Sequence, residues 1–163
     1  MFGQVNGLPT HALALHAAVV LVPLSALLGL LFALPRSRAW SRVPLVVVSV
    51  AAVVAVFVAR QSGEQLQRVL QLQGPAADLV HEHAQRSDVL QVASLGYAVL
   101  AVIAFAITRS SAPSRGLLTA ISVLVVLGAA GVAFQTYRVG DVGARAVWNP
   151  TGQVDYGSAD SGD

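Results

Sequence analysis

The sequence predicts an all-α integral membrane protein, folded as a four-helix up-down bundle. Of its 163 residues, 55% are hydrophobic and only 11% are charged, and the mean hydropathy is +0.68. Soluble domains contain about a quarter charged residues, so this chain belongs in a bilayer. Four apolar runs are long enough to cross a hydrocarbon layer of roughly 30 Å as helices. They cover residues 12–34, 43–59, 89–107 and 117–134.

The first run, residues 12–34, is apolar almost throughout. Pro23 lies inside it and removes one backbone donor, which predicts a local kink that neighbouring helices tolerate. A short segment rich in arginine follows, and we expect the helix to end there, at the membrane boundary. This segment contains Pro35, Arg36, Arg38, Trp40 and Arg42.

The second run, residues 43–59, is rich in valine and alanine and is short for a span. A lone strand could not satisfy its backbone groups in lipid, so a helix that continues beyond Arg60 is the simpler solution. In that continuation Leu66, Val69 and Leu70 recur at the spacing of one helix face, opposite Gln, Glu and Arg. The second helix is therefore predicted to end as an amphipathic extension.

Gly74 and Pro75 then interrupt the pattern, and Pro75 suits the first turn of a new helix. The segment from Arg60 to Asp88 is the only long polar stretch between apolar runs. It therefore predicts an extended polar helical hairpin between the second and third helices.

The third run, residues 89–107, and the fourth, residues 117–134, are joined by a short loop that contains two arginines and no acid. A small-residue patch, Gly128-Ala129-Ala130-Gly131, permits close helix approach in the fourth run. We expect residues 1–148 to form one transmembrane domain. Residues 149–163, rich in Gly, Ser and Asp, are expected to be a disordered polar tail.

The distribution of arginine predicts the orientation. Five arginines lie in the two short loops, whereas the longer connector and the tail mix basic with acidic residues. By the positive-inside rule the short loops are cytoplasmic, so both termini and the polar hairpin lie outside the cytoplasm of a bacterial inner membrane. Residues 1–10 carry no charged side chain, so they lack the basic start of a cleaved signal peptide and the first run is expected to be retained.

Several function classes are excluded or disfavoured by composition. The chain has no cysteine, so it has no disulfide, no thiolate metal site and no haem attached through Cys-x-x-Cys-His. A dispersed formal charge of +2 gives no nucleic-acid footprint. No nucleophile or phosphate-loop motif is present, so an enzyme is not expected. No ionisable residue lies in the middle of a run, which places a transporter of ions or small solutes third among the functions considered.

Polar groups at the helix ends are expected to gather in one layer, which makes that layer a candidate site. His11 and His16 differ by five positions and project roughly 140° apart on a helix, so only one can face inward. We expect this to be His16, with His11 at the headgroup boundary. His16 and His83 are then candidate ligands for a b-type haem or a divalent metal, with Glu64 and Asp141 orienting them.

The alternative is that each histidine binds a carboxylate or a backbone carbonyl and sets helix register. The run His81-Glu82-His83 does not form a metal cluster by itself. Residues two apart on a helix lie about 200° apart, so His81 and His83 cannot reach the same ion.

Three short motifs resemble a known family. They are Leu8-Pro9-Thr10-His11-Ala12-Leu13-Ala14-Leu15-His16, Ser62-Gly63-Glu64 and Glu82-His83-Ala84. Together they resemble the bacterial membrane family catalogued as domain of unknown function 2231, over about residues 8–148. Members have four transmembrane helices and a closing glycine-rich segment that often carries a histidine. In this chain Ala12 replaces the usual proline, and Asp141 stands where that histidine is expected.

The resemblance implies the four-helix fold, and the family's histidines suggest haem binding or electron transfer. Two functions therefore remain. The first is an accessory or structural subunit of a larger membrane complex, which would be respiratory and would contact another membrane protein or a second copy as well as the bilayer. The second is a haem- or metal-binding redox protein that uses His16 and His83.

Overall fold

The computed structural model describes residues 4–5, 7–110 and 113–155, and it confirms the all-α four-helix bundle. The helices are α1 (Thr10–Ala33), α2 (Arg38–Leu70), α3 (Pro75–Arg109) and α4 (Arg115–Trp148). Each of the four is long and apolar enough to cross a membrane. A two-residue antiparallel ladder, β1 (Gln4–Val5) with β2 (Leu8–Pro9), precedes α1.

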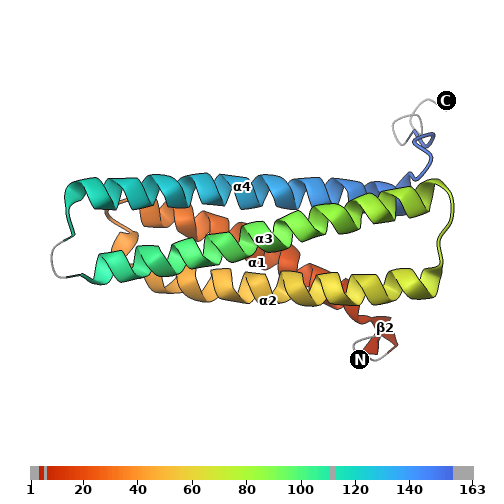
Figure 1. Cartoon of the computed structure of the whole chain (residues 1–163), viewed down its shortest axis with the longest axis horizontal. Helices are drawn as coiled ribbons and strands as arrows, with labels where there is room; N and C mark the ends of the chain where they lie inside the picture. Colours follow the sequence, from red (N-terminus) through yellow and green to blue (C-terminus); the bar gives the residue numbers. More distant parts are fainter. Residues whose placement is uncertain (1–3, 6, 111–112, 156–163) are drawn as a thin grey trace, which may run out of the picture.

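The helices alternate in direction along one long axis (Figure 1). Helix α1 packs against α2 and α4, and α3 packs against the same two helices. Helices α1 and α3 are therefore diagonal to each other, as are α2 and α4. The turn between α2 and α3 lies at the same end of the bundle as both chain ends, opposite the α1–α2 and α3–α4 connections (Figure 1).

Helices α2, α3 and α4 extend well beyond the apolar runs. Helix α2 begins at Arg38, so residues 38–42, which were expected to lie in the loop, are helical. The helix continues to Leu70, as the amphipathic pattern predicts. The turn that follows uses positive φ at Gln71 (45°) and Gly74 (66°), and α3 begins at Pro75 as expected. The prediction of a disordered tail falls largely on residues 156–163, which lie outside the described residues.

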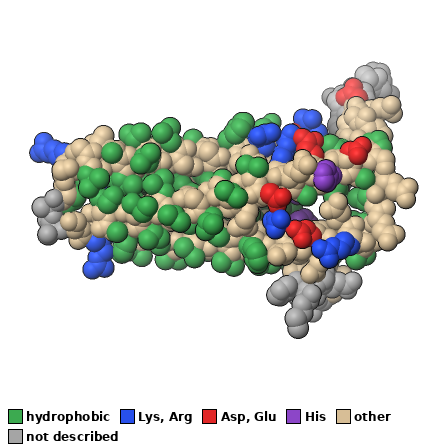
Figure 2. All heavy atoms as spheres, in the orientation of Figure 1, with side chains coloured by type: hydrophobic (Ala, Val, Ile, Leu, Met, Phe, Trp, Pro, Cys, Tyr) green, Lys and Arg blue, Asp and Glu red, His purple; other side chains and the backbone are tan. Residues whose placement is uncertain are grey.

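The outer surface of the bundle is apolar over most of its length (Figure 2). Large side chains such as Val20, Val47, Val92 and Leu127 are exposed by 60–71%. In water such a surface would be costly, but lipid solvates it, so this surface contacts the bilayer. Acidic and histidine side chains gather at the end that carries the α2–α3 turn, together with five of the ten arginines (Figure 2). This end is called the polar end below. The other five arginines lie at the opposite end.

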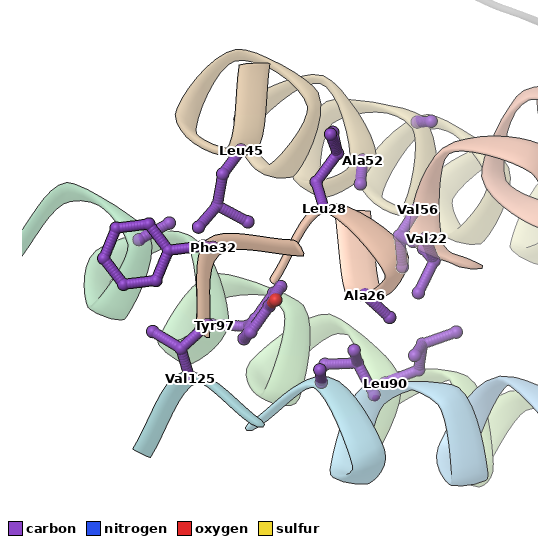
Figure 3. Packing of buried hydrophobic residues seen from close by; sticks show 14 of the residues in the cluster. Val22, Ala26, Leu28, Phe32, Leu45, Ala52, Val56, Leu90, Tyr97 and Val125 are labelled. Carbon is purple, nitrogen blue, oxygen red and sulfur yellow. The ribbon is translucent and has the colours of Figure 1, made fainter. Parts of the chain in front are cut away.

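The interior is built from small residues with a few large ones between them. Phe32, Leu45, Val22 and Val125 are fully buried, and they interdigitate with alanines from all four helices (Figure 3). Small residues let the helix backbones approach closely, which is the main source of helix association in lipid. The predicted patch in α4 divides between two faces: Gly128 lies against Tyr97 and Ala129 is buried, whereas Ala130 and Gly131 are exposed.

The burial pattern repeats between the two helical hairpins. Buried positions of α1 recur in α3 72 residues later, and those of α2 recur in α4 80 residues later. The first set pairs Ala18, Ser25, Ala26, Gly29 and Phe32 with Leu90, Tyr97, Ala98, Ala101 and Ala104. The second pairs Ser41, Leu45, Ser49, Ala52 and Ala59 with Ile121, Val125, Ala129, Val132 and Val139. The bundle is therefore two parallel repeats around a pseudo-two-fold axis along its length.

Candidate functional site

His11 lies in the first turn of α1, at the polar end, and faces α2. Its Nδ1 is 2.8 Å from the main-chain oxygen of Ala59. The ring lies against Gly63, one helical turn further along α2, where a Cβ atom would approach the imidazole to 3.1 Å. Glycine at position 63 thus makes room for the ring, and the carbonyl of Ala59 sets its orientation.

His83 lies in α3 and makes the same arrangement with α4. Its Nδ1 is 3.0 Å from the main-chain oxygen of Val139, and a Cβ atom at Gly143 would approach the ring to 3.0 Å. All three residues are the repeat counterparts of His11, Ala59 and Gly63. The two imidazoles therefore occupy equivalent positions on diagonal helices, on either side of the pseudo-two-fold axis.

The hydrogen bonds define the tautomer of each ring. A carbonyl oxygen can only accept, so Nδ1 of His11 and of His83 carries the proton and donates it. In the neutral imidazole Nε2 then bears the lone pair. No hydrogen bond among the described residues engages either Nε2 atom. In both rings the lone pair on Nε2 is therefore available to a metal ion.

The electrostatic environment favours the neutral form of His83 by lowering its pKa. This residue lies about two turns before the apolar run of α3, outside the span itself. Burial lowers the pKa of its imidazole, the hydrogen bond to Val139 raises it, and the charge of His11 lowers it again. His11 is therefore one of the groups whose charge acts on this imidazole. Neutral imidazole is the form that binds metals.

The expectation that His16 faces the interior is wrong. His16 is exposed, and its Nδ1 bonds to the main-chain oxygen of Ala12 in its own helix. Only one of the two histidines faces inward, as their spacing predicts. Packing against α2 makes this His11. His16 and His83 are thus not brought together. His81 is also turned outward, where its ring contacts Gln85.

The carboxylates proposed as orienting groups are engaged by arginines. Glu64 lies 3.3 Å from Arg60 and 3.8 Å from Arg68, and Asp141 lies 3.1 Å from Arg145. Neither acid is hydrogen-bonded to an imidazole among the described residues; the backbone carbonyls take that role. The hydrogen bonds to backbone carbonyls that the sequence-based alternative expects are present at His11 and His83.

Two more acids of the polar end are paired in the same way. Asp88 binds Arg60 and so links α3 to α2, while Glu82 binds Arg86 on its own helix. Arg86 also donates to the main-chain oxygen of Arg138, 3.1 Å away, and so links α3 to α4. In each of these pairs an arginine balances the charge of an acid at the same end of the bundle as the two imidazoles.

One buried polar atom next to His11 in the sequence lacks a partner. The hydroxyl of Thr10, the residue before His11, is buried and makes no hydrogen bond. The described residues contain no group of three or more His, Cys, Asp or Glu side chains placed to share an ion. The donor set at this site is therefore two imidazole nitrogens, with a hydroxyl close to one of them in the chain.

Sequence reasoning missed His11 as an inward residue. The sequence does contain a pattern that points to the two rings. Gly63 follows Ala59 by four residues and Gly143 follows Val139 by four, so each glycine lies one helical turn beyond the carbonyl that accepts the hydrogen bond. At both of these glycines the edge of an imidazole packs closely against the helix. Only the partner helix shows which histidine packs there.

The comparisons with known proteins agree with this description. Neither the curated proteins nor the solved structures gave a match. A family described as a predicted membrane protein (DUF2231) matches residues 7–155, which include all four helices and both histidine arrangements. The chain therefore belongs to the predicted membrane protein family DUF2231.

Proposed function

We propose that this membrane protein binds a metal centre through Nε2 of His11 and Nε2 of His83. The observation that carries the proposal is the duplicated arrangement, in which each ring donates Nδ1–H to a main-chain oxygen of the neighbouring helix. Metal-binding histidines almost always donate their other ring nitrogen to a carboxylate, a carbonyl or water. That hydrogen bond orients the ring and leaves the opposite nitrogen for the ion.

The surroundings of the rings support this function over a purely structural one. A hydrogen bond alone could be made by many side chains, whereas Gly63 and Gly143 also leave room for the Nδ1–Cε1 edge of an imidazole. Four-helix bundles place ligands on facing helices around their axis, as the diagonal pair of His11 and His83 does. A bound metal, or the iron of a b-type haem, would supply electron transfer or ligand exchange at the polar end.

The test compares histidine variants that separate ligation from hydrogen bonding. His11→Asn and His83→Asn keep an N–H donor near the position of Nδ1 but remove Nε2. Detergent-purified protein is examined by absorption spectroscopy and elemental analysis. We expect a metal or a reducible haem band in the wild type, its loss in both Asn variants, and its retention in the matched controls His16→Asn and His81→Asn, whose rings face outward. A wild type that stays free of metal and haem after loading with either would contradict the proposal.

A second candidate function is that of an accessory subunit in a larger membrane complex. It is supported by the outward face of α4, where Gly131 is exposed and a Cβ atom would meet nothing within 4 Å. Exposed Leu127 and Phe134 lie one turn to either side of it. A neighbouring transmembrane helix could approach closely at this glycine. A partner that co-purifies in fixed ratio with the wild type, and not with Gly131→Leu, would support this function.

We also infer that both termini lie outside the cytoplasm of a bacterial inner membrane. This is supported by the end opposite the polar end, where residues 34–42 and 109–116 contain five arginines and no acid. When a reporter enzyme that works only outside the cytoplasm is fused after Trp148, we expect it to be active. Activity of a reporter that works only in the cytoplasm, fused at the same place, would show the opposite orientation.

A further inference from the structure

We infer that the metal held by His11 and His83 is monovalent copper, bound by the two Nε2 atoms. This inference rests on the proposed function, since it names the ion for the same pair of imidazoles. Four features of the site bear on the choice of metal: the number of ligands, their charge, the space around the rings and the access to Nε2.

The first feature is the number of ligands. The described residues offer two imidazoles and no third His, Cys, Asp or Glu grouped with them. Zinc sites in proteins use three or four protein ligands, and iron and nickel require still higher coordination or a macrocycle. Cuprous ion has a filled d shell and is stable with two nitrogen donors in line. Among the metals that imidazole binds, it is the one that this donor set can satisfy by itself.

The second feature is charge. Imidazole binds a metal as a neutral ligand, and Glu64, Glu82, Asp88 and Asp141 are each engaged by an arginine. These four carboxylates are therefore already balanced and compensate a bound cation less well. His83 is half-buried, where uncompensated charge is costly, and the cost rises steeply with the charge of the ion. A monovalent ion is favoured over a divalent one for this reason.

The third feature is space. The rings of His11 and His83 lie within 3.0–3.1 Å of where glycine Cβ atoms would be, so the Nδ1–Cε1 edge of each is packed closely against a helix. The two best-formed hollows of the described residues are grooves of about 410 and 200 Å³, and neither is lined by His11 or His83. A porphyrin would have to displace packed helices, whereas a single ion would not.

The fourth feature is access. The buried polar atoms that lack partners include the hydroxyl of Thr10 but neither Nε2 atom. Since Nε2 makes no hydrogen bond in the described part of the chain, each of these nitrogens retains contact with solvent. An ion can therefore reach both donors from the polar end.

The experiment measures binding of cuprous ion alone. The full-length protein in detergent, under ascorbate and without oxygen, competes for Cu(I) with a coloured bidentate chelator, and parallel samples receive Zn(II) or haemin. We expect one Cu(I) per chain and an X-ray absorption edge typical of two-coordinate copper. Removal of a group that only orients a ligand costs about 10–100-fold in affinity, so His11→Asn and His83→Asn should each lose more than about 100-fold. His16→Asn and His81→Asn should bind as the wild type does.

Circular dichroism verifies that each variant is folded, and Gly143→Ala provides a second test if either Asn variant is not. Its added Cβ displaces the His83 ring without removing it, so copper affinity should fall measurably. Gly140→Ala, where a Cβ meets nothing within 4 Å, is its control.

The outcomes separate the two proposals. If Zn(II) or haemin binds through the same two histidines at least as tightly as Cu(I), the copper inference fails and the proposed metal-binding function stands. If Cu(I) binds equally well to wild type and to both Asn variants, or if neither metal nor haemin binds the wild type, both proposals fail.

Discussion

Tyr97 of α3 donates a hydrogen bond to the main-chain oxygen of Ser25 in α1, across a distance of 3.2 Å. Ser25 is the counterpart of Tyr97 in the internal repeat, 72 residues earlier. Two residues related by a two-fold axis can touch only near that axis. The contact between Tyr97 and Ser25 therefore shows that the pseudo-two-fold axis runs through the core, where the α1–α2 and α3–α4 hairpins pack together. Two glycines make room for the ring, Gly29 of α1 and Gly128 of α4.

Gly29→Ala is expected to destabilise the protein. The new Cβ would lie 1.9 Å from the hydroxyl oxygen of Tyr97, which cannot move freely because the ring is also packed against Gly128. Overpacking of this kind costs about 1–3 kcal/mol. Thermal unfolding in detergent measures it, with Gly96→Ala as the control, where a Cβ meets nothing within 4 Å.

The double variant Gly29→Ala with Tyr97→Phe tests the cause of that loss. Removing the phenol oxygen relieves the closest contact, so part of the stability should return, beyond the sum of the two single effects. If the two effects simply add, the Tyr97 hydroxyl is not what opposes a side chain at position 29.

Arg38 is expected to contribute more stability than the other arginines of its end of the bundle. Its guanidinium donates to the main-chain oxygens of Phe32 and Ala33 and to the Ser122 hydroxyl, at 3.1–3.2 Å. It also lies over the Phe32 ring, 5.7 Å from its centroid. These bonds satisfy carbonyls that the end of α1 leaves open.

Hydrogen bonds from charged groups are worth about 1.5–3 kcal/mol each when buried. Because Arg38 is partly exposed, we expect Arg38→Ala to lose roughly 2 kcal/mol in total. Arg36→Ala, at an exposed position, should change the midpoint of thermal unfolding very little. Equal effects of the two substitutions would show that net charge, and not these contacts, matters at this end.

Stability should depend on pH through His83. The pKa of the folded imidazole lies below its ordinary value of 6.5, so between those two values the unfolded chain binds more protons than the folded one. The contribution of His83 to the free energy of unfolding is therefore fully present above pH 6.5 and is lost as the pH falls below that value. The slope is at most about 1.4 kcal/mol per pH unit for one group.

The measurement is the unfolding midpoint of the metal-free protein between pH 8 and 5, for the wild type and for His83→Asn. The Asn variant should show a shallower acid dependence, while His81→Asn should follow the wild type because that ring is exposed. Identical slopes for all three proteins would mean that other titrating groups of the polar end control the response.

Hydrogen bonding by His83 itself should be separable from ligation. In the absence of metal, His83→Ala leaves the carbonyl of Val139 without its donor and opens space beside Gly143, which costs about 1 kcal/mol. His83→Asn retains a donor and should lose less. If the two variants are equally stable, the contact to Val139 contributes nothing measurable.

Much of the fold is determined by the sequence alone. A hydrophobic content of 55% and four long apolar runs require helices in lipid, because no other local structure satisfies every backbone group there. The turn at Gly74 and Pro75 and the amphipathic end of α2 follow from local residue chemistry, and the structure agrees with both. These features depend on neighbours in the sequence, so pattern is sufficient to predict them.

The identity of the inward histidine was decided only by tertiary structure. The spacing of His11 and His16 shows that they face different ways, but the rotation of α1 about its axis depends on a carbonyl and a glycine 48 and 52 residues away, in α2. The internal repeat is hidden for a related reason. Core positions in lipid accept almost any small or apolar residue, so Ser25 and Tyr97 show no likeness until packing places them at the same axis.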